Sequence, residues 1–354
     1  MRSRTVPEPP ALRAVAARVE RRLADLLTAE SARWSALSPD LAGPYSALER
    51  FVMNGGKRLR PAFCFWGFVG AGGDPQDPAI VDAGAAFEML QAFALVHDDV
   101  MDGSSRRRGT TTLHLEFVDR HHADGWRGEA RRFGEGVAVL VGDLAHVYAD
   151  QLLPSRDPEV LAVWDELRLE LNAGQLLDVL GTARGDTDPV NARRISRYKS
   201  GKYTIERPLH VGAALAGRLD DLADQLSAYG DPLGEAFQLR DDLLGAFGDE
   251  AATGKPVGDD LREGKPTPLL ATASARAGDD QARALARVGD RDLDEGGVRA
   301  IQDVLVATGA VSSVEARIDE LTATAIEAVS ASDLVPEART ALVELARFVA
   351  HRRA

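Results

Sequence analysis

Three carboxylates stand at the end of an apolar stretch from Phe87 to Asp102, which reads FEMLQAFALVHDDVMD. Neither glycine nor proline interrupts this stretch, so one helix can carry all of it. On that helix Asp98 and Asp102 share a face, and Asp99 lies one position round. Acids repel one another and oppose the helix dipole at a helix C-terminus, so the cluster indicates a bound divalent cation. A solvated acidic helix end is the alternative reading of this stretch alone.

A second acidic pair, Asp241 and Asp242, occurs in FQLRDDLLGA near the end of another expected helix, Leu219 to Ala246. Helices that face each other across a bundle can hold metal ions between such pairs. Basic groups accompany the acids, in NGGKRLRP at Asn54 to Pro61 and in Arg106 to Arg108. The planar fork of arginine suits phosphate oxygens, and a glycine turn with cations suits a phosphate cradle. Together these groups are what a metal–diphosphate site requires.

Three other features carry weaker chemical signals. The run from Lys199 to Lys202, KSGK, could be a second phosphate contact, although a helix C-terminus with its usual lysines explains it as well. His114, His121 and His122 lack the paired spacing of metal ligands, so we expect them to be solvated. The glycine- and proline-rich stretch from Gly248 to Pro268 reads as a functional loop.

The rest of the chain predicts an all-α fold, because Ala, Leu, Arg and Glu dominate and no run alternates as a strand does. A net charge of −13 argues against nucleic acid or an anionic membrane surface as the main partner. The single cysteine, Cys64, excludes an intrachain disulfide and is expected to be buried. We find no secretory signal and no membrane-spanning run, so a cytoplasmic protein with a loose N-terminus over residues 1–10 is expected. The length of 354 residues by itself favours two domains.

Six segments make the chain resemble the trans-isoprenyl diphosphate synthases, the polyprenyl synthetase family. They are GGKRLRP (55–61), HDDVMD (97–102), RRG (107–109), YKSGK (198–202), FQLRDD (237–242) and GKPVGDDLREGK (254–265). Any one could occur by chance, but all six follow the order of the family between about residues 54 and 267. The resemblance implies one domain over residues 1–354, a bundle of roughly ten or more helices around a central active-site cavity, and a homodimer. This expectation replaces the two domains that length alone favours.

The resemblance also implies a Mg²⁺-dependent prenyltransferase that condenses isopentenyl diphosphate head-to-tail with allylic diphosphates. In this family the released pyrophosphate, and no protein base, takes the final proton. Three Mg²⁺ ions would be held by Asp98, Asp99, Asp102, Asp241 and Asp242. The allylic diphosphate would contact Arg107, Lys199, Gln238 and Lys255. Isopentenyl diphosphate would contact Gly56, Lys57, Arg60, Gln91 and Arg108.

The residues before the first acids bear on product length, because bulky side chains there form the cavity floor in the family. Phe93 lies five residues before Asp98, about 7.5 Å down the helix. The small Ala94 follows it, and Leu90 lies three residues before it. This pattern resembles geranylgeranyl (C20) synthases, with farnesyl (C15) synthases as the alternative.

The chain departs from the family pattern at Gly245, where the second motif usually has a third aspartate. This departure keeps open a non-catalytic subunit of a heteromeric synthase. A class I terpene cyclase is disfavoured by GGKRLRP, which such an enzyme does not need. The segment from Leu115 to Glu135 looks longer than is usual in the family, and the sequence suggests no function for it.

Overall fold

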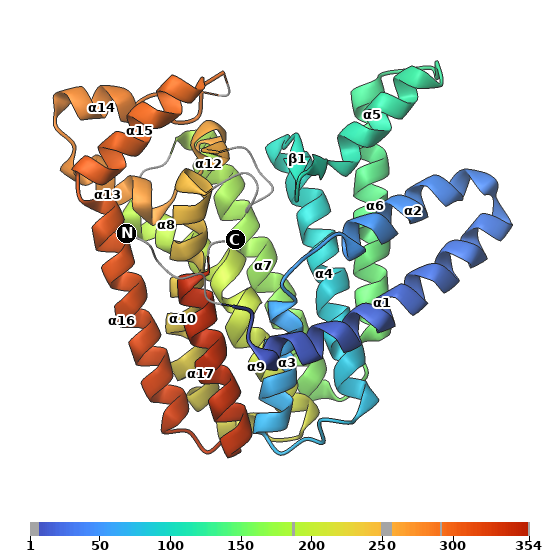
Figure 1. The fold of residues 1–354 in the computed structure, drawn as a ribbon. Coiled ribbons are helices and arrows are strands. Elements are labelled where there is room, and N and C mark those ends of the chain that lie inside the picture. The colour runs from blue at the N-terminus through green and yellow to red at the C-terminus, as the bar shows by residue number, and fades with distance from the viewer. Residues whose placement is uncertain (1–6, 186–187, 249–256, 291, 353–354) are drawn as a thin grey trace. The chain divides into compact units, whose positions relative to one another are not determined.

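A computed structural model of the chain describes residues 7–185, 188–248, 257–290 and 292–352. Helices make up most of it, which confirms the all-α prediction (Figure 1). The strands found in these residues are the short antiparallel β1 (Arg106–Arg107) and β2 (Thr110–Thr111). The chain divides into two compact units. The N-terminal unit comprises residues 10–65 and 75–155, and the C-terminal unit comprises the remaining described residues.

The N-terminal unit is built around α4 (Pro78–Asp102), which packs along α6 (Ala130–Leu152) (Figure 1). Its other elements are α1 (Pro10–Leu37), η1 (Pro39–Leu41), α2 (Ala42–Met53), the start of α3 (Leu59–Gly70), the β1–β2 ribbon and α5 (Leu113–Ala123).

Helix α4 carries the whole stretch from Phe87 to Asp102, as the sequence predicts, and it begins at Pro78. The Asp77 side chain accepts a hydrogen bond from the backbone N–H of Ala79, and Pro78 takes the first helical position, as both residue types prefer. All residues from 83 to 90 are buried, as in a helix of the protein core. By length and composition α4 could cross a bilayer, but 61% of its most apolar 18-residue window is buried within the protein.

The C-terminal unit is built around α10 (Leu219–Phe247), which runs on through Pro232. It packs against η2 (Ser196–Glu206), α9 (Arg207–Leu215), α16 (Ala310–Ser330) and α17 (Pro336–His351). The other helices of this unit are α7 (Pro158–Arg184), α8 (Pro189–Ile195), α12 (Asp259–Glu263), α13 (Pro268–Arg276), α14 (Asp279–Leu285) and α15 (Glu295–Ala307).

The structure corrects the prediction for the histidines. His114 and His121 are buried, and only His122 is exposed as expected. The cause is that α5 folds back on the first turns of α6, where the rings of His121, Trp126 and Phe133 pack together. Burial lowers the pKa of His114 from its ordinary value. The long segment after residue 115 is therefore a helical hairpin with a small aromatic core of its own.

Cys64 is fully buried in α3, as the sequence predicts. The KSGK run does not end an ordinary helix, because it lies in η2, which is a π-helix. Such wide helical turns are rare and occur frequently at functional sites.

Candidate active site

The first acidic motif occupies the last turns of α4 and is closed by Arg107. Asp99 is 1% exposed and Asp98 is 8% exposed. Arg107 Nε and Nη2 donate to Asp99 Oδ1 at 2.9 and 2.6 Å, and Nη2 also donates to Asp98 Oδ2 at 3.2 Å. One guanidinium thus offsets the repulsion between two buried carboxylates. Asp102 follows one turn later and is partly exposed.

The ribbon of β1 and β2 places Arg107 and Arg108 on different partners. Arg107 pairs with Thr110 in the ribbon, and the two turn residues Arg108 and Gly109 both have positive φ, at 51° and 76°. That pattern is typical of a tight two-residue hairpin turn. Arg108 Nη1 therefore reaches the end of α2, where it donates to Asn54 O and Gly55 O at 3.1 Å each. A cation suits these carbonyls at a helix C-terminus.

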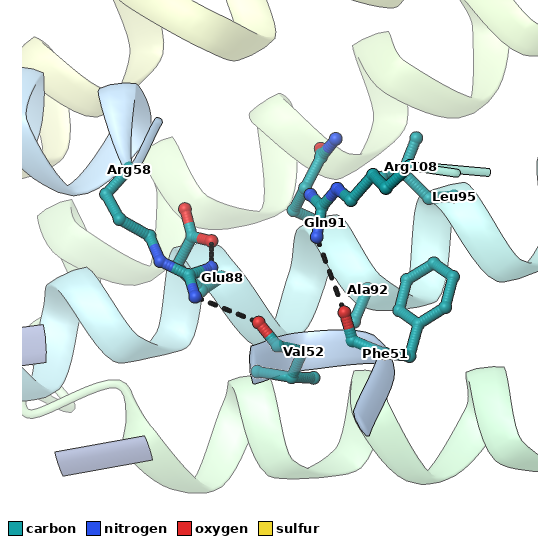
Figure 2. A pocket seen from close by; sticks show the side chains of 8 residues that line it. All are labelled: Phe51, Val52, Arg58, Glu88, Gln91, Ala92, Leu95 and Arg108. Carbon is teal, nitrogen blue, oxygen red and sulfur yellow. Dashed lines mark hydrogen bonds and ion pairs between the residues drawn. The ribbon is translucent and has the colours of Figure 1, made fainter. Parts of the chain in front are cut away.

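A small hollow lies between α2, α4 and the turn at residues 55–58 (Figure 2). Gln91 and Arg108 line one side of it, and Arg58 and Glu88 line the other. The Oε1 atom of Gln91 is buried and has no hydrogen-bond partner in the part of the chain that the structure describes. The remaining lining residues are Phe51, Val52, Ala92 and Leu95.

Gly56 in the turn has little room for a side chain beside Arg58 and Arg108. Its φ is 110°, which an L side chain rarely adopts. A Cβ atom there would lie 3.2 Å from both Arg108 Nη2 and Arg58 Nη1. Lys57 and Arg60 lie on either side of Arg58 and are partly exposed. The structure therefore brings together Gly56, Gln91 and Arg108, three of the residues that the resemblance assigns to isopentenyl diphosphate.

The second acidic motif lies on α10 in the C-terminal unit. Gln238 Nε2 donates to Asp242 Oδ1 at 2.8 Å, whereas Asp241 is paired with Arg352. Arg352 is buried, and its guanidinium lies 4.1 Å from the Phe237 ring centroid. Arg352 was not among the predicted site residues. Its only signal is the basic HRRA end of the chain, which does not reveal the partner.

Asp242 is 4% exposed, and its Oδ2 atom has no hydrogen-bond partner among the described residues. Burial raises the pKa of Asp242 to about 8, although the hydrogen bond from Gln238 lowers it, and the charges of Asp260 and Asp241 raise it further. The carboxyl group is therefore largely protonated at neutral pH when no metal ion is bound. A divalent cation would favour the charged form.

Gly245, the departure from the family pattern, is packed against Asp260 of α12. A Cβ atom at position 245 would collide with the carboxylate of Asp260. The space of a third acid on α10 is thus taken by an acid that another helix supplies.

Lys199 lies in η2, where its Nζ atom is 2.5 Å from Oδ2 of the buried Asp178 on α7. Lys255, the remaining residue expected at the allylic diphosphate, lies outside the described residues.

Phe93 points toward α6. Its ring stacks on His146 with centroids 4.6 Å apart, and it meets His97 edge-on at 4.7 Å. Leu90 is fully buried, and Ala94 is partly exposed. His146 is a neighbour that sequence reasoning missed, because nothing in the spacing along the chain links the two helices.

No group of three His, Cys, Asp or Glu side chains in the described ranges forms a ready-made metal cage. Arg107 and Arg352 hold three of the acids instead. Mg²⁺ does not require such a cage, since it usually binds one or two carboxylates together with phosphate oxygens and water.

Comparisons with known proteins show the family to which the chain belongs. The family model for polyprenyl synthetase matches residues 44–305. The crystal structure of geranylgeranyl pyrophosphate synthase from Corynebacterium glutamicum, complexed with isoprenyl diphosphate and magnesium, matches with a TM-score of 0.91 and 38% identity, covering 97% of this chain and 99% of that one. The chain is 30% identical over 275 residues to geranylfarnesyl diphosphate synthase of Aeropyrum pernix, covering 75% of this chain and 80% of the relative. It is 31% identical over 300 residues to octaprenyl diphosphate synthase of Haemophilus influenzae, covering 83% and 84%.

The chain therefore belongs to the polyprenyl synthetase family. It is an enzyme of the trans-prenyltransferase class.

The raised pKa of Asp242 predicts how stability depends on pH in the metal-free protein. The unfolded chain has the ordinary value of 3.8 and the folded chain about 8, so the folded state binds the proton more tightly. Stability is then lost as pH rises from about 4 to 8, by at most about 1.4 kcal/mol per pH unit. Asp242→Asn cannot ionise, so its stability relative to wild type should increase across this window. Urea unfolding in EDTA at pH 5 and pH 8 measures the difference.

Asp119→Asn is the matched control, because Asp119 is an exposed acid on α5. An equal pH response of Asp242→Asn and wild type would contradict the raised pKa.

The contact between Gly245 and Asp260 predicts that Gly245→Ala lowers the free energy of unfolding where a glycine-to-alanine change in a helix would ordinarily raise it. Alanine is favoured over glycine inside a helix by about 1 kcal/mol, so Gly245→Ala would stabilise α10 if the space were empty. Because the new Cβ meets Asp260, we expect Gly245→Ala to destabilise the protein by about 1 kcal/mol. In an Asp260→Ala background the same substitution should become stabilising. Urea unfolding of the four proteins measures both effects, and a stabilising Gly245→Ala in the wild-type background would refute the contact.

Proposed function

We propose that this enzyme elongates allylic diphosphates with isopentenyl diphosphate in the presence of Mg²⁺ and makes chiefly geranylgeranyl diphosphate. The observation that carries the proposal is the buried acid pair Asp98–Asp99, held by an arginine that also suits a diphosphate. The hollow lined by Gln91 and Arg108 supports a second diphosphate subsite, formed by residues that lie near Asp98 and Asp99 in the sequence.

The acids fit Mg²⁺ by their chemistry, because carboxylate oxygens are ligands that this ion prefers. Asp242 supports the same assignment, because its Oδ2 atom is buried and has no hydrogen-bond partner among the described residues. We assign the ions, three per active site, to Asp98, Asp99, Asp102, Asp241 and Asp242. Bound Mg²⁺ would supply positive charge that stabilises the departing pyrophosphate.

The side chains of the enzyme would bind and orient the two substrates. Arg107, Lys199, Gln238 and Lys255 would hold the allylic diphosphate, so that its C–O bond can break with the charge held on pyrophosphate. Gly56, Lys57, Arg60, Gln91 and Arg108 would hold isopentenyl diphosphate, whose double bond attacks the allylic cation. The released pyrophosphate would then accept a proton from the resulting carbocation, and loss of this proton forms the new double bond. Apolar residues of α4 would exclude water from the cation.

Product length is assigned from Phe93, because its aromatic ring is braced by His97 and His146. The names of the relatives do not by themselves determine the product length of this chain, since they range from geranylgeranyl to octaprenyl. A rigid aromatic stack beneath the first acids favours an early stop to elongation.

We also propose a homodimer in the cytoplasm. Helix α6 exposes a run of large apolar side chains, with Val139 40%, Leu140 65% and Val147 53% exposed. A second copy of the chain would cover such a stripe.

The first test is elongation by the purified chain, given isopentenyl diphosphate, Mg²⁺ and C5, C10 or C15 allylic diphosphate in turn. We expect a C20 product that EDTA abolishes, and a rate at least about 100-fold lower for Asp99→Asn. Asp119→Asn serves as the control and should retain wild-type activity. Chromatography of the dephosphorylated products reads out chain length. A C15 product would support the prenyltransferase activity but place the cavity floor nearer to the first acids than Phe93. No elongation from any primer would favour a non-catalytic subunit.

Phe93→Ala should lengthen the product by one or more isoprene units, because it removes the ring that is stacked against α6. Phe133→Ala is the control, since Phe133 lies about 20 Å from His146 along the same helix. An unchanged product length in Phe93→Ala would show that Phe93 does not form the cavity floor.

A further inference from the structure

Arg58 is the one cation of GGKRLRP to which the proposed function gives no role. It is 3% exposed, whereas Lys57 and Arg60 on either side are partly exposed. A buried arginine is rare unless it is paired, so its contacts indicate what it does.

The guanidinium of Arg58 contacts three helices. It forms an ion pair with Glu88 of α4, which is 5% exposed. Its Nε atom is 3.2 Å from Glu20 Oε1 of α1, and its Nη2 atom donates to Val52 O of α2 at 2.9 Å. Burial by itself would lower the pKa of Arg58, but Glu88 and Glu20 raise it above its ordinary value. The charge of Arg58 is therefore already neutralised within the protein.

The backbone of Arg58 is strained. Its φ is 51°, in the left-handed region that a residue with a side chain rarely occupies, and Gly55 and Gly56 before it also have positive φ. Such a conformation costs about 1 to 2 kcal/mol and persists only where the surroundings enforce it. The anchored side chain supplies that enforcement at the point where the turn passes into α3.

The partner of Arg58 is on the helix that carries Gln91. Glu88 and Gln91 are three residues apart on α4 and so share a face. Figure 2 shows Arg58 and Glu88 beside the hollow that Gln91 and Arg108 also line. The ion pair thus ties the turn that bears Lys57 to the helix that bears Gln91.

We propose that Arg58 and Glu88 are a positioning pair for the isopentenyl diphosphate subsite. They hold the turn at residues 55–58 at a fixed place on α4 and do not themselves bind the phosphate. The inference rests on the proposed function, because it assumes that this subsite takes isopentenyl diphosphate.

The test separates positioning from stability. Arg58→Met leaves Glu88 buried and uncompensated, which destabilises a protein, whereas Arg58→Met with Glu88→Leu replaces the pair by apolar groups and should restore stability. We expect the double variant to unfold at the same urea concentration as wild type. Its KM for isopentenyl diphosphate should nevertheless rise at least about tenfold, while its KM for the allylic substrate changes less than about twofold. Direct calorimetric binding of isopentenyl diphosphate to both proteins gives a readout that is independent of turnover.

Arg22→Met is the control, because Arg22 of α1 forms a partly exposed ion pair with Asp82 of α4, and these are two of the helices that Arg58 contacts. It should leave both KM values unchanged. A folded double variant with a wild-type KM for isopentenyl diphosphate would overturn the positioning role and leave the proposed function intact. If the wild-type protein neither binds nor elongates with isopentenyl diphosphate, the proposed function fails and this inference fails with it.

Discussion

Repulsion between carboxylates is the constraint on which both acidic motifs depend. Two acids at the C-terminal end of α4 oppose each other and the helix dipole, and burial strengthens both effects. Arg107 offsets this cost for Asp98 and Asp99. On α10 the solution differs, because Asp241 has Arg352 while Asp242 retains its proton. Asp98, Asp99 and Asp241 therefore each have a cation beside them, and Asp242 has a proton, before any ligand is bound.

In the proposed function, the cations beside these acids would also bind the diphosphate groups of the substrates. A guanidinium that already lies against the acids has lost its side-chain freedom on folding, so less entropy remains to be lost on binding a phosphate there. Lys199 is held in the same way by Asp178, and Arg108 by carbonyl groups at the end of α2. If the proposed function holds, the same side chains serve both stability and substrate recognition.

The sequence predicted the features that depend on residues near one another in the chain. The helix over Phe87 to Asp102, the acids at its end and the burial of Cys64 follow from local pattern and composition. The burial of His114 and His121 could not be foreseen, because it depends on α5 folding back on α6. The same holds for Arg352 with Asp241 and for Phe93 with His146, whose partners are far apart in the sequence. The burial of Arg58 could not be predicted either, because nothing in the spacing distinguishes it from Lys57 and Arg60.

Gly245 has a consequence for how members of such families are recognised. An alignment column that expects a third aspartate would count this chain as degenerate at that position. In space, however, the carboxylate of Asp260 from α12 lies where a side chain at position 245 would begin. An acid can thus be absent from a motif and present at the same point of the fold, contributed by a segment that the motif does not include. Judging relatives as inactive from a substituted column therefore requires a search of neighbouring loops and short helices for a replacement.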